Sequence, residues 1–263
     1  MNVVILCGGR GVMDPETRQR IPKAMLQIGG KPLLWHVMKI FATAGFTDFV
    51  LALGEGGEII RRYFYYQHLD ARDIEIAGAS GAIRYLSNSP EENWRIKCVD
   101  TGINAATGSR IARCRRHVEG ETFLVAYSDC LCSVNLHALL AEHKRTGKLV
   151  TVTGVQPPSR FGTFMVGEDG VVGYTTDSKL IGRGGFLNGG FMVMNPGIFS
   201  YVEVFNECNL EQEVFTRLAS ERNVGIFTHE GYWHAIDTER DVQSVSRLLL
   251  ENKRPWLATY ASE

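Results

Sequence analysis

The sequence predicts an α/β fold: a mixed, mainly parallel, doubly wound (Rossmann-like) sheet with a small antiparallel addition. Two observations predict it. Short apolar runs, several of them closed by glycine, alternate with helical stretches through the first half of the chain. From Gly162 to Asn195 the sequence pattern changes to short β-type runs with many glycines. No repeat divides the 263 residues, so we expect one domain over residues 1–263, with a core of about 1–240 and a C-terminal helical closure of about 241–263.

The elements follow in order from hydrophobic periodicity. "MNVVILC" is typical of a buried parallel strand because it is apolar throughout and ends at glycines. "KPLLWHVMKIFATAGF" places its apolar residues on one helical face, and Gly45 stops the helix. The next segments predict a strand ("DFVLAL"), a helix ("EIIRRYFYYQHL"), a third strand ("DIEIAG"), a buried strand ("ETFLVAYSDC"), a helix ("NLHALLAEHKRTG") and a strand ("LVTVTGV"). "LEQEVFTRLASERN" and "RDVQSVSRLLLENK" are predicted as closing helices.

Composition narrows the class of protein. A hydrophobic share of 44% with a net charge of -1 is ordinary for a globular protein that buries a sizeable core. The near-zero charge argues against a nucleic-acid or membrane-surface partner, and no apolar run approaches the roughly 20 residues of a membrane span. Six scattered cysteines without a disulfide framework favour a cytoplasmic location. Cys130 and Cys132 are interpreted as small apolar residues at a strand end, because no second ligand pair stands near them.

The stretch "VVILCGGRG" predicts a phosphate-binding loop. Glycines after a strand leave backbone N–H groups free to converge on phosphate oxygens, although two glycines also occur in strand-to-loop turns for steric reasons alone. The spacing is neither G-x-G-x-x-G nor a P-loop, and no acidic residue ends the second strand, so an NAD-dependent oxidoreductase is set aside. Lys23 adds a positive charge a short distance beyond the loop, where it serves a bound phosphate or is simply a solvated lysine.

Two aspartates are candidate metal ligands. Asp129 ends the predicted strand "FLVAYSD", where the carboxyl edge of a parallel sheet meets a ligand crevice. Asp237 follows the aromatic stretch "GYWHAID". Mg²⁺ that binds substrate phosphates typically takes one or two carboxylates from the protein. An aspartate at a strand end equally suits a helix cap, and sequence alone does not pair two residues so far apart.

Longer motifs resemble a known family. "VVILCGGRG…IPKAMLQIGGKPLLWHVMK", "VDTGINAATGSRIARCRRHV", "FLVAYSD", "FLNGGFMVMNP", "LEQEVF" and "GYWHAIDTERD" are similar to segments of the sugar-1-phosphate nucleotidylyltransferases. The resemblance is closest to the glucose-1-phosphate cytidylyltransferases and covers essentially the whole chain. It implies transfer of a nucleotidyl group, CMP by overall likeness, from a nucleoside triphosphate to a sugar 1-phosphate or related phosphorylated acceptor, with release of pyrophosphate. It also implies a homo-oligomer.

The resemblance further implies roles for particular residues. Lys23 would be catalytic and neutralise charge at the reacting phosphates, and Asp129 and Asp237 would hold Mg²⁺ as the cofactor. The nucleotide, most simply CTP, would be bound by Leu6, Gly8, Gly9, Arg10, Gly11, Asn104, Ser109 and Ser128. The acceptor would be bound by Lys179, Asn188 and Gly189.

One departure from the family pattern leaves two hypotheses. The family loop carries an arginine where this chain has Met13, and Asp14 adds negative charge next to it. Loss of a charge-assisted contact to a triphosphate costs roughly 2–4 kcal/mol, or about 30- to 1000-fold in rate, unless Arg10, Arg18 or Arg20 compensates. The chain is therefore either an active transferase with an altered acceptor or a weakly active or inactive homologue that binds nucleotide or nucleotide-sugar as a regulatory or partner subunit.

Overall fold

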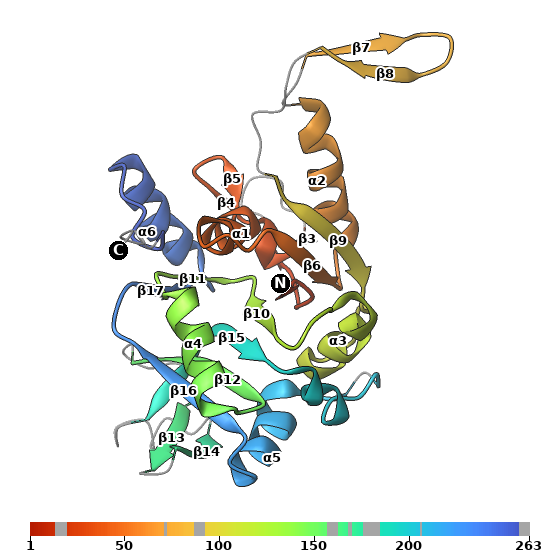
Figure 1. The fold of residues 1–263 in the computed structure, drawn as a ribbon. Helices are drawn as coiled ribbons and strands as arrows, with labels where there is room; N and C mark the ends of the chain where they lie inside the picture. Colours follow the sequence, from red (N-terminus) through yellow and green to blue (C-terminus); the bar gives the residue numbers. More distant parts are fainter. Residues whose placement is uncertain are drawn as a thin grey trace.

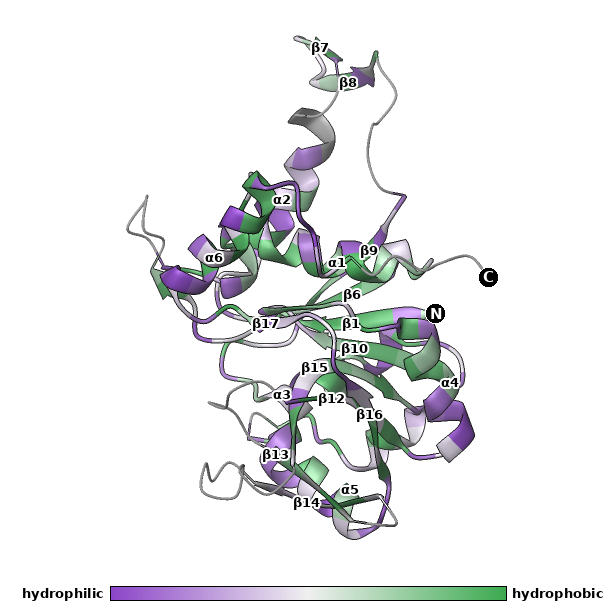
Figure 2. Cartoon of the chain, turned by 90° about the vertical axis from the view of Figure 1, so that its left-hand side faces the viewer, coloured by the Kyte–Doolittle hydropathy of each residue, from purple (hydrophilic) through white to green (hydrophobic). Residues whose placement is uncertain are grey.

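The main sheet has nine strands in the described part of the chain, and seven of them follow a Rossmann-like order. The computed structural model describes residues 1–13, 20–70, 73–86, 93–156, 163–167, 170–175, 185–205 and 207–257. Within them the order of these seven is β9–β6–β1–β10–β15–β12–β16; Figure 1 shows the fold, and Figure 2 labels each of the seven strands. The strands are β1 (Asn2–Leu6), β6 (Asp48–Leu53), β9 (Arg95–Asp100), β10 (Phe123–Tyr127), β12 (Val150–Val155), β15 (Phe186–Met194) and β16 (Val224–His229).

The sheet is mainly parallel, with one reversed strand. β1 pairs in parallel with β6 and β10, β6 with β9, and β12 with β16. β15 runs antiparallel to both of its neighbours in this order, β10 and β12. Its amino-terminal half also carries the antiparallel pair β13 (Thr163–Gly167) and β14 (Gly170–Thr175). The predicted mixed, mainly parallel sheet with a small antiparallel addition is confirmed.

Two hydrophobic cores cover the two faces of this sheet. Side chains alternate between faces along each strand, so Val3 and Ile5 join one core and Val4 and Leu6 the other. The first core is closed by α1 (Leu33–Thr43), α2 (Gly57–Asp70), α4 (Leu136–Thr146) and α6 (Glu239–Leu250). The second is closed by α3 (Thr107–Cys114) and α5 (Phe215–Ser220). Figure 2 shows the apolar central strands between these helices. Because both faces are covered, the strands read as continuous apolar runs.

Local signals fix the helix ends. The Asn135 side chain accepts a hydrogen bond from the Ala138 backbone at the start of α4, and Gly147, with φ of 62°, closes that helix. At the start of α6, Thr238 and Asp241 form a reciprocal capping box. The last described residues pack back onto the first core, where Trp256 is fully buried.

The segment "DIEIAG" is a strand, but it does not join the main sheet as predicted. It forms β7 (Ile74–Ala77), whose one partner strand among the described residues is β8 (Ala82–Tyr85), in a hairpin. Figures 1 and 2 show this hairpin beyond the end of α2, away from the sheet. The third parallel strand is instead β9, whose sequence "RIKCVD" alternates polar and apolar residues because it lies at the sheet edge.

Short elements complete the chain. Four two-stranded pairings lie outside the main sheet: β7–β8, β2 (Val12–Met13) with β3 (Arg20–Ile21), β4 (Gln27–Ile28) with β5 (Lys31–Pro32), and β11 (Cys130–Cys132) with β17 (Trp233–Ala235). Single helical turns span Lys23–Met25, Arg115–His117, Pro196–Ser200 and Leu210–Val214. Cys130 and Cys132 are both buried in the core, as expected of small apolar residues. In the described part of the chain, no helix has the length and apolar character of a membrane span.

Candidate active site

Two adjoining cavities open at the carboxyl ends of the parallel strands, the edge where α/β sheets bind ligands. The first, the glycine-loop cavity, has a volume of about 570 Å³. The second, the β15 cavity, has a volume of about 200 Å³. Both are lined by Tyr127, Asp129 and Glu211, which therefore form the wall between them. The glycine-loop cavity is further lined by Leu6, Cys7, Gly8, Gly9, Arg10, Lys23, Thr107, Arg110 and Ser128, and the β15 cavity by Cys130, Tyr174, Asn188, Gly189, Gly190, Trp233, Ala235 and Asp237.

Lys23 lies between the two predicted metal ligands. Its Nζ is 2.5 Å from Asp237 Oδ1 and 3.6 Å from Asp129 Oδ2. The helical turn Lys23–Met25 fixes its backbone, because Ala24 and Met25 are buried in the core while the lysine side chain stays one-third exposed. The ammonium group thus occupies the point to which both carboxylates are directed.

A short strand pairing brings Asp129 and Asp237 together across more than a hundred residues of sequence. β11 pairs antiparallel with β17, and the Ile236 backbone donates a 2.8 Å hydrogen bond to the Asp129 carbonyl oxygen. The Asp237 backbone N–H in turn donates to Asp241 Oδ2 at 3.2 Å, which ties this residue to the capping box of α6. The backbone positions of both aspartates are therefore set by neighbouring elements rather than by a ligand.

Charge and burial act in opposite directions at this point. Burial raises the pKa of the Asp129 carboxyl from its usual value, and the negative charge of Asp237 adds to this, while Lys23 lowers it. Burial lowers the pKa of Lys23, but the hydrogen bond to Asp237 and the two negative charges outweigh burial and leave that pKa raised. The lysine therefore stays protonated at neutral pH, whereas burial destabilises the Asp129 carboxylate even with the Lys23 ammonium beside it.

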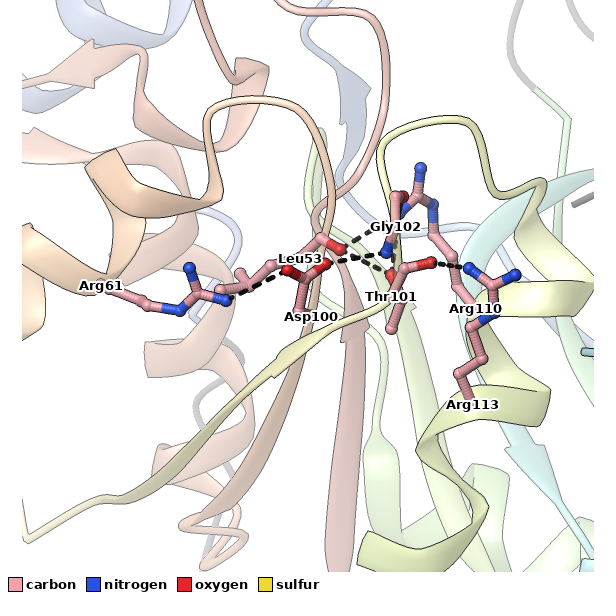
Figure 3. Close-up of polar contacts among 7 residues, drawn as sticks. All are labelled: Leu53, Arg61, Asp100, Thr101, Gly102, Arg110 and Arg113. Atoms are coloured by element: carbon pink, nitrogen blue, oxygen red, sulfur yellow. Dashed lines mark hydrogen bonds and ion pairs between the residues drawn. The ribbon is translucent and has the colours of Figure 1, made fainter.

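Arg110 is a buried cation beneath the glycine loop. Only 2% of the residue is exposed. Its guanidinium donates to the carbonyl oxygens of Leu53, Gly102 and Ile103, and to Thr101 Oγ1 at 2.8 Å, as shown in part in Figure 3.

The Arg110 guanidinium also explains two of the glycines. A Cβ atom on Gly8 would lie 2.1 Å from its Nη1, and one on Gly54 would lie 2.6 Å from the same atom. Nε of Arg110 has no hydrogen-bond partner among the described residues, although the side chain lines the glycine-loop cavity. Arg110 belongs to the motif "VDTGINAATGSR" but was not among the residues predicted from the sequence.

The wall between the cavities is a hydrogen-bonded network. Tyr127 Oη donates to Glu211 Oε1, and Asn188 Nδ2 donates to Tyr127 Oη at 2.9 Å. From the other side, Thr107 Oγ1 donates to Glu211 Oε2 at 2.7 Å. Glu211 lies in the motif "LEQEVF" but was not among the predicted site residues, because nothing in its spacing indicates that it meets Tyr127.

The predicted nucleotide-binding residues are only partly brought together. Leu6, Gly8, Gly9, Arg10 and Ser128 line the glycine-loop cavity beside Lys23. Gly11 lies just beyond them, where its carbonyl oxygen accepts a 3.3 Å hydrogen bond from Arg20. Asn104 is exposed in the turn before α3 and does not line the cavity. Ser109 lies in α3, is fully buried and does not line the cavity either. Thr107 and Arg110 of the same helix line the cavity instead.

On the acceptor side, Asn188 and Gly189 line the β15 cavity. They reach this edge because β15 is reversed, so its first residues meet the carboxyl ends of the other strands. Trp233 Nε1 donates to the Gly189 carbonyl oxygen at 2.8 Å and fixes the position of this segment. Lys179 lies outside the described residues, as do Asp14 and Arg18.

Comparison with known proteins identifies the family. A sequence model described as Nucleotidyl transferase matches residues 2–177. The chain belongs to the nucleotidyl transferase family. It is 36% identical over 256 residues to a probable glucose-1-phosphate cytidylyltransferase of Bacillus subtilis, covering 97% of this chain and 99% of that protein. It is 34% identical over 258 residues to the glucose-1-phosphate cytidylyltransferase of Salmonella typhimurium, covering 97% and 98%. The predicted membership among sugar-1-phosphate nucleotidylyltransferases is confirmed.

Solved structures agree with this nucleotidyltransferase fold. HddC from Yersinia pseudotuberculosis, complexed with GMP-PN, superposes with a TM-score of 0.69 at 18% identity, covering 94% of this chain and 99% of that one. At that identity the likeness supports the fold alone. Met13, which stands where the family loop is expected to carry an arginine, is 56% exposed and lines a different cavity, formed with α6, rather than the glycine-loop cavity.

The chemistry of the donor set at Lys23 fits a magnesium ion. Asp129 and Asp237 offer hard carboxylate oxygens, which Mg²⁺ prefers, and they converge on a point already occupied by a positive charge. In the described ranges, no group of three His, Cys, Asp or Glu side chains is arranged to hold a metal. A magnesium ion at this nucleotidyltransferase site would therefore complete its shell with phosphate oxygens and water.

Proposed function

We propose that this chain transfers a CMP group from CTP to the phosphate of a sugar 1-phosphate or a related phosphorylated acceptor, releases pyrophosphate and depends on Mg²⁺. One observation carries the proposal. Lys23, Asp129 and Asp237 meet where a cavity lined by the glycine loop adjoins a second cavity lined by Asn188 and Gly189. One ammonium group, together with two carboxylates that can hold a metal cation, suits a reaction that joins two anionic substrates.

In the proposed reaction, an oxygen of the acceptor phosphate forms a bond to the α-phosphorus of CTP. The bond from that phosphorus to the oxygen bridging to the β-phosphate breaks, and pyrophosphate leaves with the bonding electrons. No protein nucleophile is needed, because the acceptor phosphate is already ionised at neutral pH. The chain's part is to position two anions and to balance the charge that their approach creates.

Each group of residues has a place in this proposal. Backbone N–H groups of the glycine loop would bind the triphosphate, and Lys23 would move from the carboxylates to the reacting phosphates. Asp129 and Asp237 would hold Mg²⁺, which when bound supplies positive charge to the attacking and leaving oxygens. Asn188 and the Gly189 backbone would orient the acceptor. The choice of cytosine rests on the similarity to the two cytidylyltransferases.

The test is pyrophosphate release with Mg²⁺ and each of CTP, UTP, dTTP, GTP and ATP, against a panel of sugar 1-phosphates and phosphonates. We expect release with CTP and one acceptor class, and loss of release in Lys23→Ala and Asp129→Ala. Release only with another nucleotide would refute the cytidylyl assignment. Absence of release with every pair, while CTP still raises the melting temperature, would favour the inactive nucleotide-binding homologue instead.

A further inference from the structure

Glu211 occupies a position that the proposed reaction does not yet use. Its carboxylate lines both the glycine-loop cavity and the β15 cavity. Its backbone is held at the start of the turn Leu210–Val214, where the Asn209 side chain accepts hydrogen bonds from the backbone N–H groups of Glu211 and Gln212. The carboxylate is therefore presented to the junction of the cavities by a capped turn.

Both hydroxyls that bind Glu211 donate to it. Thr107 Oγ1 donates to Glu211 Oε2 and also accepts a 3.0 Å hydrogen bond from the Leu210 backbone. Tyr127 Oη accepts a 2.9 Å hydrogen bond from Asn188 Nδ2, so its proton is directed to Oε1. Two donors to one carboxyl group match an ionised carboxylate, which only accepts. They also leave each oxygen with capacity to accept one more hydrogen bond.

The surroundings of Glu211 indicate what kind of group on a bound substrate would donate the remaining hydrogen bond to its carboxylate. Within the described residues, no lysine or arginine forms an ion pair with Glu211, and the nearby Lys23 ammonium is paired with Asp129 and Asp237 instead. A phosphate group would be repelled by this charge, and a hydrocarbon would leave the carboxylate unsatisfied. A neutral hydroxyl group can donate a hydrogen bond to the carboxylate without bringing a second negative charge close to it. The substrates of the proposed reaction carry such hydroxyls on the ribose and on the acceptor ring.

We propose that Glu211 is a specificity-determining residue that accepts a hydrogen bond from a ring hydroxyl of a bound substrate. This inference rests on the proposed function for the identity of the substrates, though not for the presence of a hydroxyl-reading carboxylate. Tyr127 and Thr107 are positioning residues, because each fixes one carboxylate oxygen and neither needs to touch the substrate.

The hydrogen-bonded network of Glu211 and Tyr127 extends to the backbone of the β15 cavity. Asn188, which donates to Tyr127, accepts a 2.9 Å hydrogen bond from the Gly190 backbone through Oδ1. A hydroxyl read by Glu211 could belong to the ribose in the glycine-loop cavity or to the sugar in the β15 cavity. The two sources share one chemistry and are separated by deoxy analogues.

The experiment compares substrates that carry or lack one hydroxyl. The nucleotide arm measures binding of CTP, 2′-deoxy-CTP and 3′-deoxy-CTP by calorimetry, and kcat/KM with each. The acceptor arm measures binding and kcat/KM for glucose 1-phosphate and its 2-, 3-, 4- and 6-deoxy analogues. In the unmodified chain we expect one analogue, in one arm only, to be disfavoured by about 10- to 100-fold, the range for a hydrogen bond to a charged acceptor.

Glu211→Gln tests whether this discrimination belongs to Glu211. We expect the penalty for that analogue to shrink to about 3-fold or less, because the amide loses the charge and replaces one acceptor by a donor. Tyr127→Phe keeps the carboxylate but frees one oxygen, so we expect an intermediate penalty and a raised KM for the same substrate. Glu213→Gln, an exposed carboxylate on the same turn, is the matched control and should retain the full penalty. Melting curves establish that each variant is folded.

The outcomes separate this inference from the proposed function. Equal discrimination in the unmodified chain and in Glu211→Gln would overturn the role of Glu211 while leaving cytidylyl transfer intact. Absence of any deoxy penalty in either arm would overturn it as well. Lack of pyrophosphate release with intact, Glu211-dependent discrimination in the calorimetric arm would refute the proposed function and keep the inference. Failure to bind CTP and glucose 1-phosphate at all would refute both.

Discussion

Substitution Lys23→Met separates the two effects of the ammonium group that lies between Asp129 and Asp237. Methionine keeps an apolar stem of similar reach and removes the charge. Near a protein surface, a pair of unit charges about 4 Å apart has a Coulomb energy of about 4 kcal/mol. The side chains of all three groups are 30–37% exposed, so water and salt reduce the net value of each pair to about 1 kcal/mol. We therefore expect the free energy of unfolding to fall by about 1–2 kcal/mol.

The same substitution should affect metal binding and catalysis in opposite directions. Without nucleotide, Mg²⁺ should bind Lys23→Met about 3- to 10-fold more tightly, because the carboxylates lose the internal cation that competes for them. With both substrates present, kcat/KM should fall by about 100- to 1000-fold, the usual effect of removing one preorganised group that stabilises transition-state charge.

Three measurements check this prediction: urea unfolding, calorimetric titration with MgCl₂, and a continuous pyrophosphate assay. Lys144→Met is the matched control, since Lys144 is an exposed lysine beside a cavity at the opposite, amino edge of the sheet. A loss of kcat/KM below about 10-fold would refute the placement of Lys23 at the reacting phosphates. Weaker Mg²⁺ binding by Lys23→Met would refute the idea that the lysine and the metal share the same carboxylates.

Three further predictions concern pH, the buried arginine and the glycine loop. Asp129 must lose its proton to bind a cation, so kcat/KM should rise with pH through the raised pKa of Asp129, and its acid limb should lie above 3.8. The stabilising contribution of protonated Asp129 is complete below its unfolded-state pKa and is lost as pH rises through the folded-state pKa, so urea unfolding of Asp129→Asn should lack that pH dependence. Arg110→Met removes the donor to the carbonyl oxygens of Gly102 and Ile103, whereas the Leu53 oxygen keeps its hydrogen bonds from Thr101, and the free energy of unfolding should fall by about 2–4 kcal/mol, with no such loss in an exposed Arg145→Met control. Gly8→Ala should lower the melting temperature and raise the KM for CTP, because its Cβ would collide with the fixed Arg110 guanidinium. Gly9→Ala is the control and should leave the melting temperature unchanged, because the space around Gly9 is open. Equal melting temperatures for the two variants would contradict the predicted collision.

Much of the fold follows from local patterns in the sequence. Continuous apolar runs such as "NVVIL" and "FLVAY" identify strands that are buried on both faces, and caps such as Asn135 and Gly147 mark helix ends. The edge of the sheet was harder to predict. β9 is half-exposed at an edge, so its pattern is weak, while "DIEIAG" has strong β propensity but lies in a hairpin whose Ile76 is 61% exposed. Propensity identifies a strand but does not say which strand it pairs with.

The residues of the candidate site likewise fall into those that the sequence identifies and those that only the tertiary structure places. The sequence by itself determined the family, the glycine loop, and the candidacy of Lys23, Asp129 and Asp237, because these lie in contiguous motifs or directly after a recognisable strand. Only the tertiary structure decided that the two aspartates meet on Lys23, because that contact depends on the pairing of β11 with β17. Only the tertiary structure placed Arg110 under the loop and Glu211 between the cavities, since each is positioned by partners from elements distant in sequence. Residue types and short motifs can be identified from the sequence, whereas the convergence of side chains at a sheet edge depends on strand pairing between segments far apart in the sequence.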